Sequence, residues 1–154
     1  MLNNDILRRI RYTFDFEDLQ MIKIFGLADL EVTRAQVSNW MKKDDDEDYQ
    51  PINDKIFATF LNGLINLKRG NREGKQPEPE KKLTNNIILM KLKIALNLKS
   101  DEILDVLSIH DIRISEHELS AFFRKPGHKH FRECKDQILR NFLKGIQVQY
   151  RGKD

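Results

Sequence analysis

Phe60-Leu61-Asn62-Gly63, which runs on to Lys68-Arg69-Gly70, is the stretch of sequence that decides the fold. The same pattern returns 82 residues later as Phe142-Leu143-Lys144-Gly145, which runs on to Tyr150-Arg151-Gly152. The spacing between the Phe-Leu-x-Gly motif and the closing Arg-Gly is the same in both places. A fixed offset shared by two separate motifs indicates an internal repeat, so we interpret the chain as one unit written twice.

The repeat extends over most of the 154 residues. Residues 3–70 align with residues 85–152 without a gap, and about 14 of the 68 aligned positions are identical. We therefore divide the chain into a first repeat at 1–70, a Pro-containing linker at 71–84 and a second repeat at 85–154. A duplicated unit often keeps the contact that its ancestor used as a homodimer, so we expect the repeats to pack as a pseudo-dimer.

Hydrophobic spacing predicts four helices in each repeat and hence an all-α fold of two tandem four-helix repeats. The third helix has the clearest start signal. Thr33-x-x-Gln36 and Ser115-x-x-Glu118 are both capping boxes, in which each side chain pairs with a backbone N–H of the first turn.

Two further features recur at equivalent positions. Asparagine pairs open the repeats at residues 3–4 and 85–86, and because asparagine is a good N-cap, we place the first helix of each repeat after its pair. Gly63 and Gly145 lie inside the fourth helix, where glycine costs about 1 kcal/mol relative to alanine. The repetition of this cost predicts that another helix packs closely at the glycine.

The composition is that of a globular protein outside the membrane. Hydrophobic residues make up 40% of the chain, and no apolar run approaches the roughly 18 residues that a membrane span needs. The single cysteine excludes a disulfide framework and fits a reducing compartment. The N-terminal residues show no basic-then-apolar export signal, so we expect a cytoplasmic protein.

The net charge of +3 hides a difference between the repeats. Residues 3–70 carry ten Lys and Arg against twelve Asp and Glu, a net charge of −2. Residues 85–152 carry twelve against eight, a net charge of +4. The second repeat is therefore the better candidate for contact with a polyanion.

Together with the repeat, three motifs make the chain resemble the YehS-like family of bacterial proteins, which consist of two copies of a domain of unknown function. These motifs are the Asn-Asn opening, Val37-Ser38-x-Trp40 with the lysines after it, and Phe60-Leu61-x-Gly63-Leu64 before Lys68-Arg69-Gly70. The resemblance covers nearly the whole chain. It implies the two-repeat architecture, and it implies no activity.

The second and third helices of the first repeat have helix-turn-helix-like character. Val37-Ser38-Asn39-Trp40 resembles the recognition helix of repressor-type proteins, in which Arg34, Asn39 and Lys42 would face the DNA groove. Other features favour an ordinary capped helix in a bundle. The preceding connection is longer than the short turn of that motif, an acidic run follows the helix, and Glu116 replaces Arg34 in the second repeat.

The most basic segment of the chain lies after the third helix of the second repeat. It carries Arg124, Lys125, Lys129 and Arg132, and these side chains, with the terminal Arg151, are the candidates for phosphate contacts. A solvated loop without a ligand explains the same residues equally well.

Two candidate cation sites lack a full set of ligands. The acidic run at residues 44–48 has neither the alternating ligands nor the central glycine and distant glutamate of a calcium loop. His128 and His130 have no two further ligands, because Cys134 aligns with Ile52 on the apolar stripe of the fourth helix. We therefore expect no metal and no cofactor.

Catalytic motifs are also lacking, since the chain has no glycine-rich phosphate loop and no nucleophile elbow. Asp54 and Asp136 recur at the start of the fourth helix, where they are best interpreted as helix N-terminal charges. We expect a non-enzymatic regulatory protein that contacts DNA or RNA, mainly through the second repeat. The alternative is an adaptor that binds another protein and no nucleic acid. The sequence leaves the oligomeric state open.

Overall fold

The computed structural model describes residues 1–152, and every regular element among them is an α-helix. The first repeat contains α1 (Asn3–Phe14), α2 (Asp18–Leu27), α3 (Arg34–Met41) and α4 (Asp54–Arg69). The second contains α5 (Asn85–Leu96), α6 (Ser100–Ser108), α7 (Glu116–Ala121) and α8 (Asp136–Arg151). The prediction of an all-α fold with four helices in each repeat is confirmed. None of these helices is both long and apolar enough to cross a bilayer.

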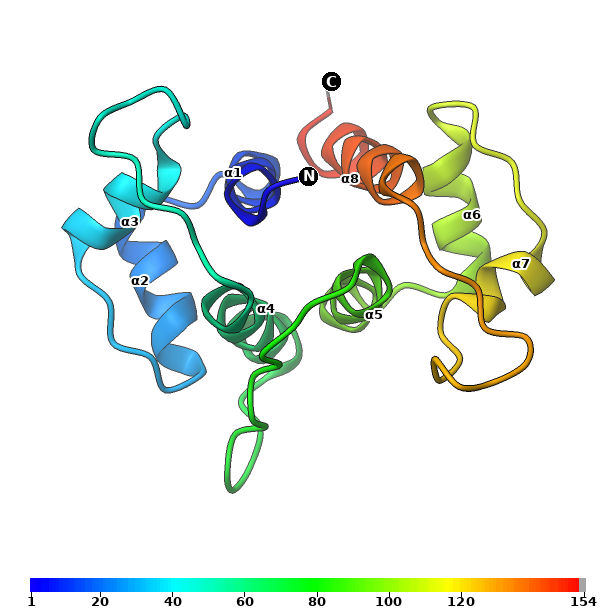
Figure 1. Ribbon diagram of the computed structural model, residues 1–154, viewed down its shortest axis with the longest axis horizontal. Helices are drawn as coiled ribbons and strands as arrows, with labels where there is room; N and C mark the ends of the chain where they lie inside the picture. The colour runs from blue at the N-terminus through cyan, green and yellow to red at the C-terminus, as the bar shows by residue number, and fades with distance from the viewer. Residues whose placement is uncertain (153–154) are drawn as a thin grey trace.

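The two repeats pack against each other as the predicted pseudo-dimer (Figure 1). α1 packs against α8 and α4 packs against α5, so the repeats meet through two equivalent helix pairs. The pairs α2–α3 and α6–α7 flank these four helices at the two ends of the long axis of the molecule (Figure 1). Buried apolar side chains from both repeats form one contiguous core.

Polar side chains on the first helix of each repeat join it to the other repeat. Arg9 on α1 donates from Nη1 to Oε1 of Gln147 on α8 at 2.8 Å. Lys91, which aligns with Arg9, donates from Nζ to Oδ1 of Asn62 on α4 at 2.6 Å. The aligned donors therefore reach the fourth helix of the other repeat, but their acceptors lie at different positions of that helix.

Gly63 and Gly145 allow the close helix contacts that their positions predicted. A Cβ atom on Gly63 would lie 1.9 Å from the carbonyl oxygen of Ile24 on α2. A Cβ atom on Gly145 would lie 2.4 Å from the carbonyl oxygen of Val106 on α6. Because both distances are far below van der Waals contact, no larger residue fits unless the backbone moves.

Both predicted capping boxes are formed. Thr33 Oγ1 accepts the N–H of Gln36 at 3.1 Å, and Gln36 Oε1 accepts the N–H of Thr33 at 2.8 Å. The Ser115–Glu118 pair makes the same two bonds at 3.0 and 3.2 Å. The helices that follow differ in length, because α7 ends two residues earlier than α3 relative to the repeat. This leaves two phenylalanines, Phe122 and Phe123, in the segment that leads to α8.

The structure corrects the expected start of the first helix in each repeat. α1 begins at Asn3 and α5 at Asn85, so both asparagine pairs lie inside a helix rather than before it. The residue before α1 makes no side-chain cap, whereas Thr84 caps α5 by accepting the N–H of Ile87 at 3.2 Å. Because the asparagine side chains do not cap these helices, they are available for other hydrogen bonds.

Replacing Gly63 or Gly145 by alanine is expected to destabilise the protein by about 1–3 kcal/mol, the usual range for overpacking. Alanine is intrinsically the better helix former by about 1 kcal/mol, so a net loss means that the clash outweighs propensity. Gly26 on α2 is the matched control, because a Cβ there meets nothing within 4 Å. Urea unfolding followed by circular dichroism gives the free energies. Equal stability of Gly63→Ala and Gly26→Ala would contradict the close contact.

Candidate binding site

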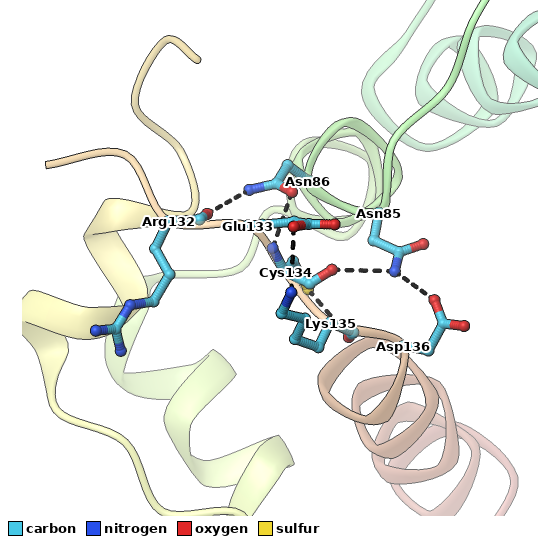
Figure 2. A network of polar contacts seen from close by, with 7 residues as sticks. All are labelled: Asn85, Asn86, Arg132, Glu133, Cys134, Lys135 and Asp136. Carbon is cyan, nitrogen blue, oxygen red and sulfur yellow. Dashed lines mark hydrogen bonds and ion pairs between the residues drawn. The ribbon is translucent and has the colours of Figure 1, made fainter. Parts of the chain in front are cut away.

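The segment between α7 and α8, residues 122–135, is irregular and is held by one buried amide (Figure 2). Asn86 on α5 donates from Nδ2 to the carbonyl oxygens of Phe122 at 3.0 Å and Arg132 at 2.8 Å. Its Oδ1 accepts the backbone N–H of Cys134 at 2.9 Å. This single side chain thereby pairs three backbone groups that no regular structure pairs, and it fixes both ends of the segment.

Asn85 ties the same segment to the start of α8. Its Nδ2 donates to the carbonyl oxygen of Cys134 at 3.0 Å and to Oδ1 of Asp136 at 2.7 Å (Figure 2). The hydrogen bond from Asn85, and after it the N-terminal ammonium of Met1 at 3.2 Å, hold the pKa of Asp136 below its usual range. Asp136 thus acts as a structural carboxylate in the first turn of α8.

The first repeat contains the same arrangement. Asn4 donates from Nδ2 to the carbonyl oxygens of Trp40 at 3.0 Å and Gln50 at 2.8 Å, and its Oδ1 accepts the N–H of Ile52 at 3.0 Å. Asn3 donates to the carbonyl oxygen of Ile52 at 3.2 Å and to the first carboxylate of α4 at 2.8 Å. The asparagine pairs therefore anchor the loop before the fourth helix in both repeats.

A cavity of about 700 Å³ lies between α5 and this segment in the second repeat. Most of its wall is apolar and is formed by Leu83, Ile87, Met90, Phe123, Pro126 and Phe131. Arg124 and the exposed Lys125 also line it, as does Glu133, whose carboxylate lies 3.2 Å from Nζ of Lys135. An apolar hollow bordered by cations suits a ligand that combines an apolar group with negative charge.

In the first repeat a charged pair stands where the second has two apolar side chains. Asp5 and Arg8 on α1 align with Ile87 and Met90 on α5. The Arg8 guanidinium donates to the Asp5 carboxylate and also to the carbonyl oxygen of Lys42, the latter at 2.9 Å. Both repeats thus have the asparagine-anchored loop, but a salt bridge on α1 corresponds to an apolar wall on α5.

The predicted nucleic-acid residues of the first repeat all have partners within the protein. Arg34 Nε lies 3.2 Å from Oδ2 of Asp18, and this hydrogen bond is the leading cause that lowers the pKa of Asp18. Lys42 Nζ donates to Oδ1 of Asn39 at 3.0 Å and lies 3.8 Å from the carboxylate of Asp48. The exposed Arg34–Asp18 pair contributes little energy, so Arg34 stays accessible to an external anion, whereas Lys42 is partly buried.

Among the candidates of the second repeat, Lys125, Lys129 and Arg132 are exposed, and Arg132 and Arg151 make contacts within the protein. Lys125 and Lys129 are exposed on the segment between α7 and α8. Arg132 pairs with a carboxylate of α7 at 3.4 Å. Arg151 closes the contact between the repeats, since its Nη1 donates to the carbonyl oxygen of Tyr12 at 2.7 Å and its guanidinium lies 3.9 Å from that ring centre.

These two groups of candidates do not form one surface. α3 and α7, with the loops that follow them, lie at opposite ends of the long axis of the molecule (Figure 1). The residues after α3 are moreover the acidic run, all five of which are exposed. The structure therefore does not combine Arg34, Asn39 and Lys42 with the basic segment at residues 124–132.

The structure brings a third histidine, His117 of α7, to the two that the sequence indicated. Its ring centre lies 6.4 Å from that of His130, which lies 5.5 Å from that of His128. The backbone N–H of His130 donates to Nδ1 of His128 at 3.0 Å. Within residues 1–152, no group of three or more His, Cys, Asp or Glu is arranged to hold a metal ion.

The cavity itself was not predicted from the sequence. Its signal is nevertheless present in the comparison of the repeats, because the exposed face of the first helix turns apolar only in the second repeat, where Ile87 and Met90 replace a charged pair. An apolar patch that one repeat has and the other lacks indicates an interaction site more strongly than isolated exposed apolar residues do.

Comparison with known proteins gives two matches. The family model described as "Protein of unknown function (DUF1456)" matches the chain twice, over residues 3–70 and 85–152. A relative from Escherichia coli (strain K12), named Uncharacterized protein YehS, is 44% identical over 150 residues, which cover 97% of this chain and 96% of that protein. No solved structure matches the chain.

Replacing Asn86 by aspartate is expected to destabilise the protein by about 2–4 kcal/mol, because two buried carbonyl oxygens lose their donor and face a carboxylate instead. Asn71→Asp makes the same chemical change on an exposed linker residue and should leave stability unchanged. Urea unfolding of both variants measures the difference. An Asn86→Asp variant as stable as Asn71→Asp would show that the amide does not hold the loop.

The thiol of Cys134 is expected to be unreactive in the folded protein. Burial is the main cause that raises its pKa to about 12, so almost no thiolate forms at about pH 8. Titration with a thiol reagent such as DTNB should give no reaction before urea unfolds the protein and one equivalent afterwards. Rapid reaction of the native protein would mean that this part of the cavity wall opens to solvent.

Proposed function

The chain belongs to the DUF1456 family, and we propose that it is a non-catalytic protein-interaction module, whose second repeat holds an apolar and acidic segment of a partner in the cavity beside Asn86. The apolar cavity with a cationic border is the observation that carries this proposal. The wall of the cavity is mostly apolar, so it suits an apolar side chain better than it suits a phosphate group. Protein partners commonly anchor themselves by placing an apolar or aromatic side chain in a pocket of this kind.

Arg124 supports the acidic character of the partner. It is half-buried and lines the cavity. A carboxylate is the acceptor that matches a guanidinium best. Together with the exposed Lys125, this side chain favours a partner that brings a carboxylate next to its apolar anchor.

Nucleic acid is the second candidate partner, and the exposure of Lys125 and Lys129 is the observation that favours it. Phosphate contacts of this type release counterions, so the affinity would fall steeply as salt rises. The protein-interaction proposal ranks first because the cavity wall is mostly apolar, and because the partly buried Lys42 and Arg151 already make contacts within the chain.

Binding of a ligand at the cavity can be tested with 8-anilinonaphthalene-1-sulfonate, a fluorescent probe that is both apolar and anionic. We expect saturable binding to the wild type. The double variant Ile87→Asp/Met90→Arg installs the pair that the first repeat carries on its own first helix, so it should fold and should bind the probe at least about tenfold more weakly. Leu19→Arg, at an exposed apolar residue of α2, is the control and should bind as the wild type does. Equal binding by all three proteins would contradict the proposed site, provided their unfolding curves agree.

Fluorescence anisotropy of labelled duplex DNA, single-stranded DNA and structured RNA at two salt concentrations separates the two candidate functions. The protein-interaction proposal expects no binding in the micromolar range at the higher salt. Salt-sensitive binding that Lys125→Glu/Lys129→Glu removes and Ile87→Asp/Met90→Arg leaves intact would instead support nucleic acid as the partner.

A further inference from the structure

We infer that the partner held at this cavity is a second copy of the chain, which presents its acidic run, residues 44–48, to the basic loop, residues 124–132, of its neighbour. This inference rests on the proposed function and names the occupant of the proposed site. The apolar wall needs an apolar group and the cationic border needs carboxylates. The chain carries both at the other end of the molecule, where five exposed carboxylates at residues 44–48 precede the half-buried Tyr49.

The two loops occupy the same position in their repeats and have opposite charge. Residues 44–48 read Asp-Asp-Asp-Glu-Asp, and the aligned residues 126–130 read Pro-Gly-His-Lys-His. The basic loop adds Arg124, Lys125 and Arg132 around this stretch. An asparagine amide anchors each loop through the same three backbone groups, so both have a defined place from which to meet a partner.

The carboxylates of the acidic run are available to a partner. All five residues are exposed. Asp46 uses Oδ1 to accept the backbone N–H of Asp48 at 2.9 Å, and Asp48 lies 3.8 Å from Lys42, so these two shape the loop. Asp44, Asp45 and Glu47 are the carboxylates that we assign to the contact. Tyr49, half-buried directly after the run, is the nearest apolar group that could accompany them into the cavity.

The two loops of one molecule cannot meet, because they lie at opposite ends of its long axis (Figure 1). Their complementarity can be satisfied only between molecules. The contact then joins different surfaces of the two copies, which makes it heterologous, and each added copy presents a new acidic run and a new basic loop. The product is an open chain or a closed ring of copies rather than a twofold dimer.

The opposite charges make association sensitive to salt. Exposed charges interact across about 30 Å at 0.01 M ionic strength and across only about 3 Å at 1 M. Sedimentation velocity should therefore show species larger than the monomer at low ionic strength and a shift toward monomer at 1 M. A sedimentation coefficient that remains that of a monomer at every protein concentration and low salt would overturn the inference.

Charge exchange provides the specific test. Asp44→Lys/Asp45→Lys/Glu47→Lys gives a chain with two basic loops, and Lys125→Glu/Lys129→Glu lowers the net charge of residues 124–132 from +4 to 0. Each variant alone should sediment as a monomer at low salt. An equimolar mixture should associate, because the native basic loop of the first variant then meets the native acidic run of the second. Lys81→Glu/Lys82→Glu, two exposed linker residues, makes the same charge change elsewhere and should associate as the wild type does. A mixture that stays monomeric, or a linker variant that loses association, would overturn the inference.

The naphthalenesulfonate measurement separates failure of this inference from failure of the proposed function. If the wild type binds the probe at the cavity yet remains monomeric at low salt, the site stands and its partner is another acidic protein. If the wild type associates and Ile87→Asp/Met90→Arg prevents association, both the site and its occupant are supported. Association that this double variant leaves unchanged would place the contact outside the cavity and overturn the inference.

Discussion

Two buried asparagine side chains, Asn4 and Asn86, carry the constraint on which the rest of the structure depends. Each amide pairs with three backbone groups at the end of the third helix and in the loop that leads to the fourth helix of its repeat. These loops have no regular structure, so without the amide their backbone groups would be unpaired beside the core. The place of the loop sets where α4 and α8 begin, and in the second repeat it sets where Phe123 and Phe131 stand as walls of the cavity.

The asparagine amide anchors a loop in both repeats, and equivalent contacts hold the repeats together. Asp54 accepts the backbone N–H of Leu83 at 2.8 Å, and Asp136 lies 3.2 Å from the N-terminal nitrogen of Met1. Met1 and Leu83 occupy the same position relative to their repeats, two residues before the first helix. Each of them contacts a carboxylate of the other repeat. The linker, residues 71–84, keeps the halves at a high effective concentration, which favours an interface of two helix pairs over separation.

On this symmetric frame the repeats differ in charge rather than in architecture. A salt bridge on α1 corresponds to an apolar face on α5, and an acidic run corresponds to a basic loop. Counting charges along the chain favoured a polyanion as ligand. The structure shows that Arg34, Lys42, Arg132 and Arg151 have partners within the molecule, whereas the apolar wall beside Arg124 and Lys125 has none that fills the hollow among residues 1–152. This difference supports the proposed protein partner over phosphate contacts.

By itself the sequence determined the features that depend on neighbouring residues or on the repeat offset. The all-helical class, the two repeats and both capping boxes belong to this set, because a capping box joins residues three apart and the repeat is visible as identity at one spacing. The close contact at Gly63 and Gly145 was also predictable, since a costly residue kept twice implies a reason. The role of the asparagine pairs was not predictable from the sequence, because the same amide can either cap a helix or bind a loop. Only the tertiary structure decided between them, by bringing Asn86 to backbone groups 36, 46 and 48 residues away. The cavity has the same origin, since it exists only where α5 meets a loop that this long-range amide holds in place.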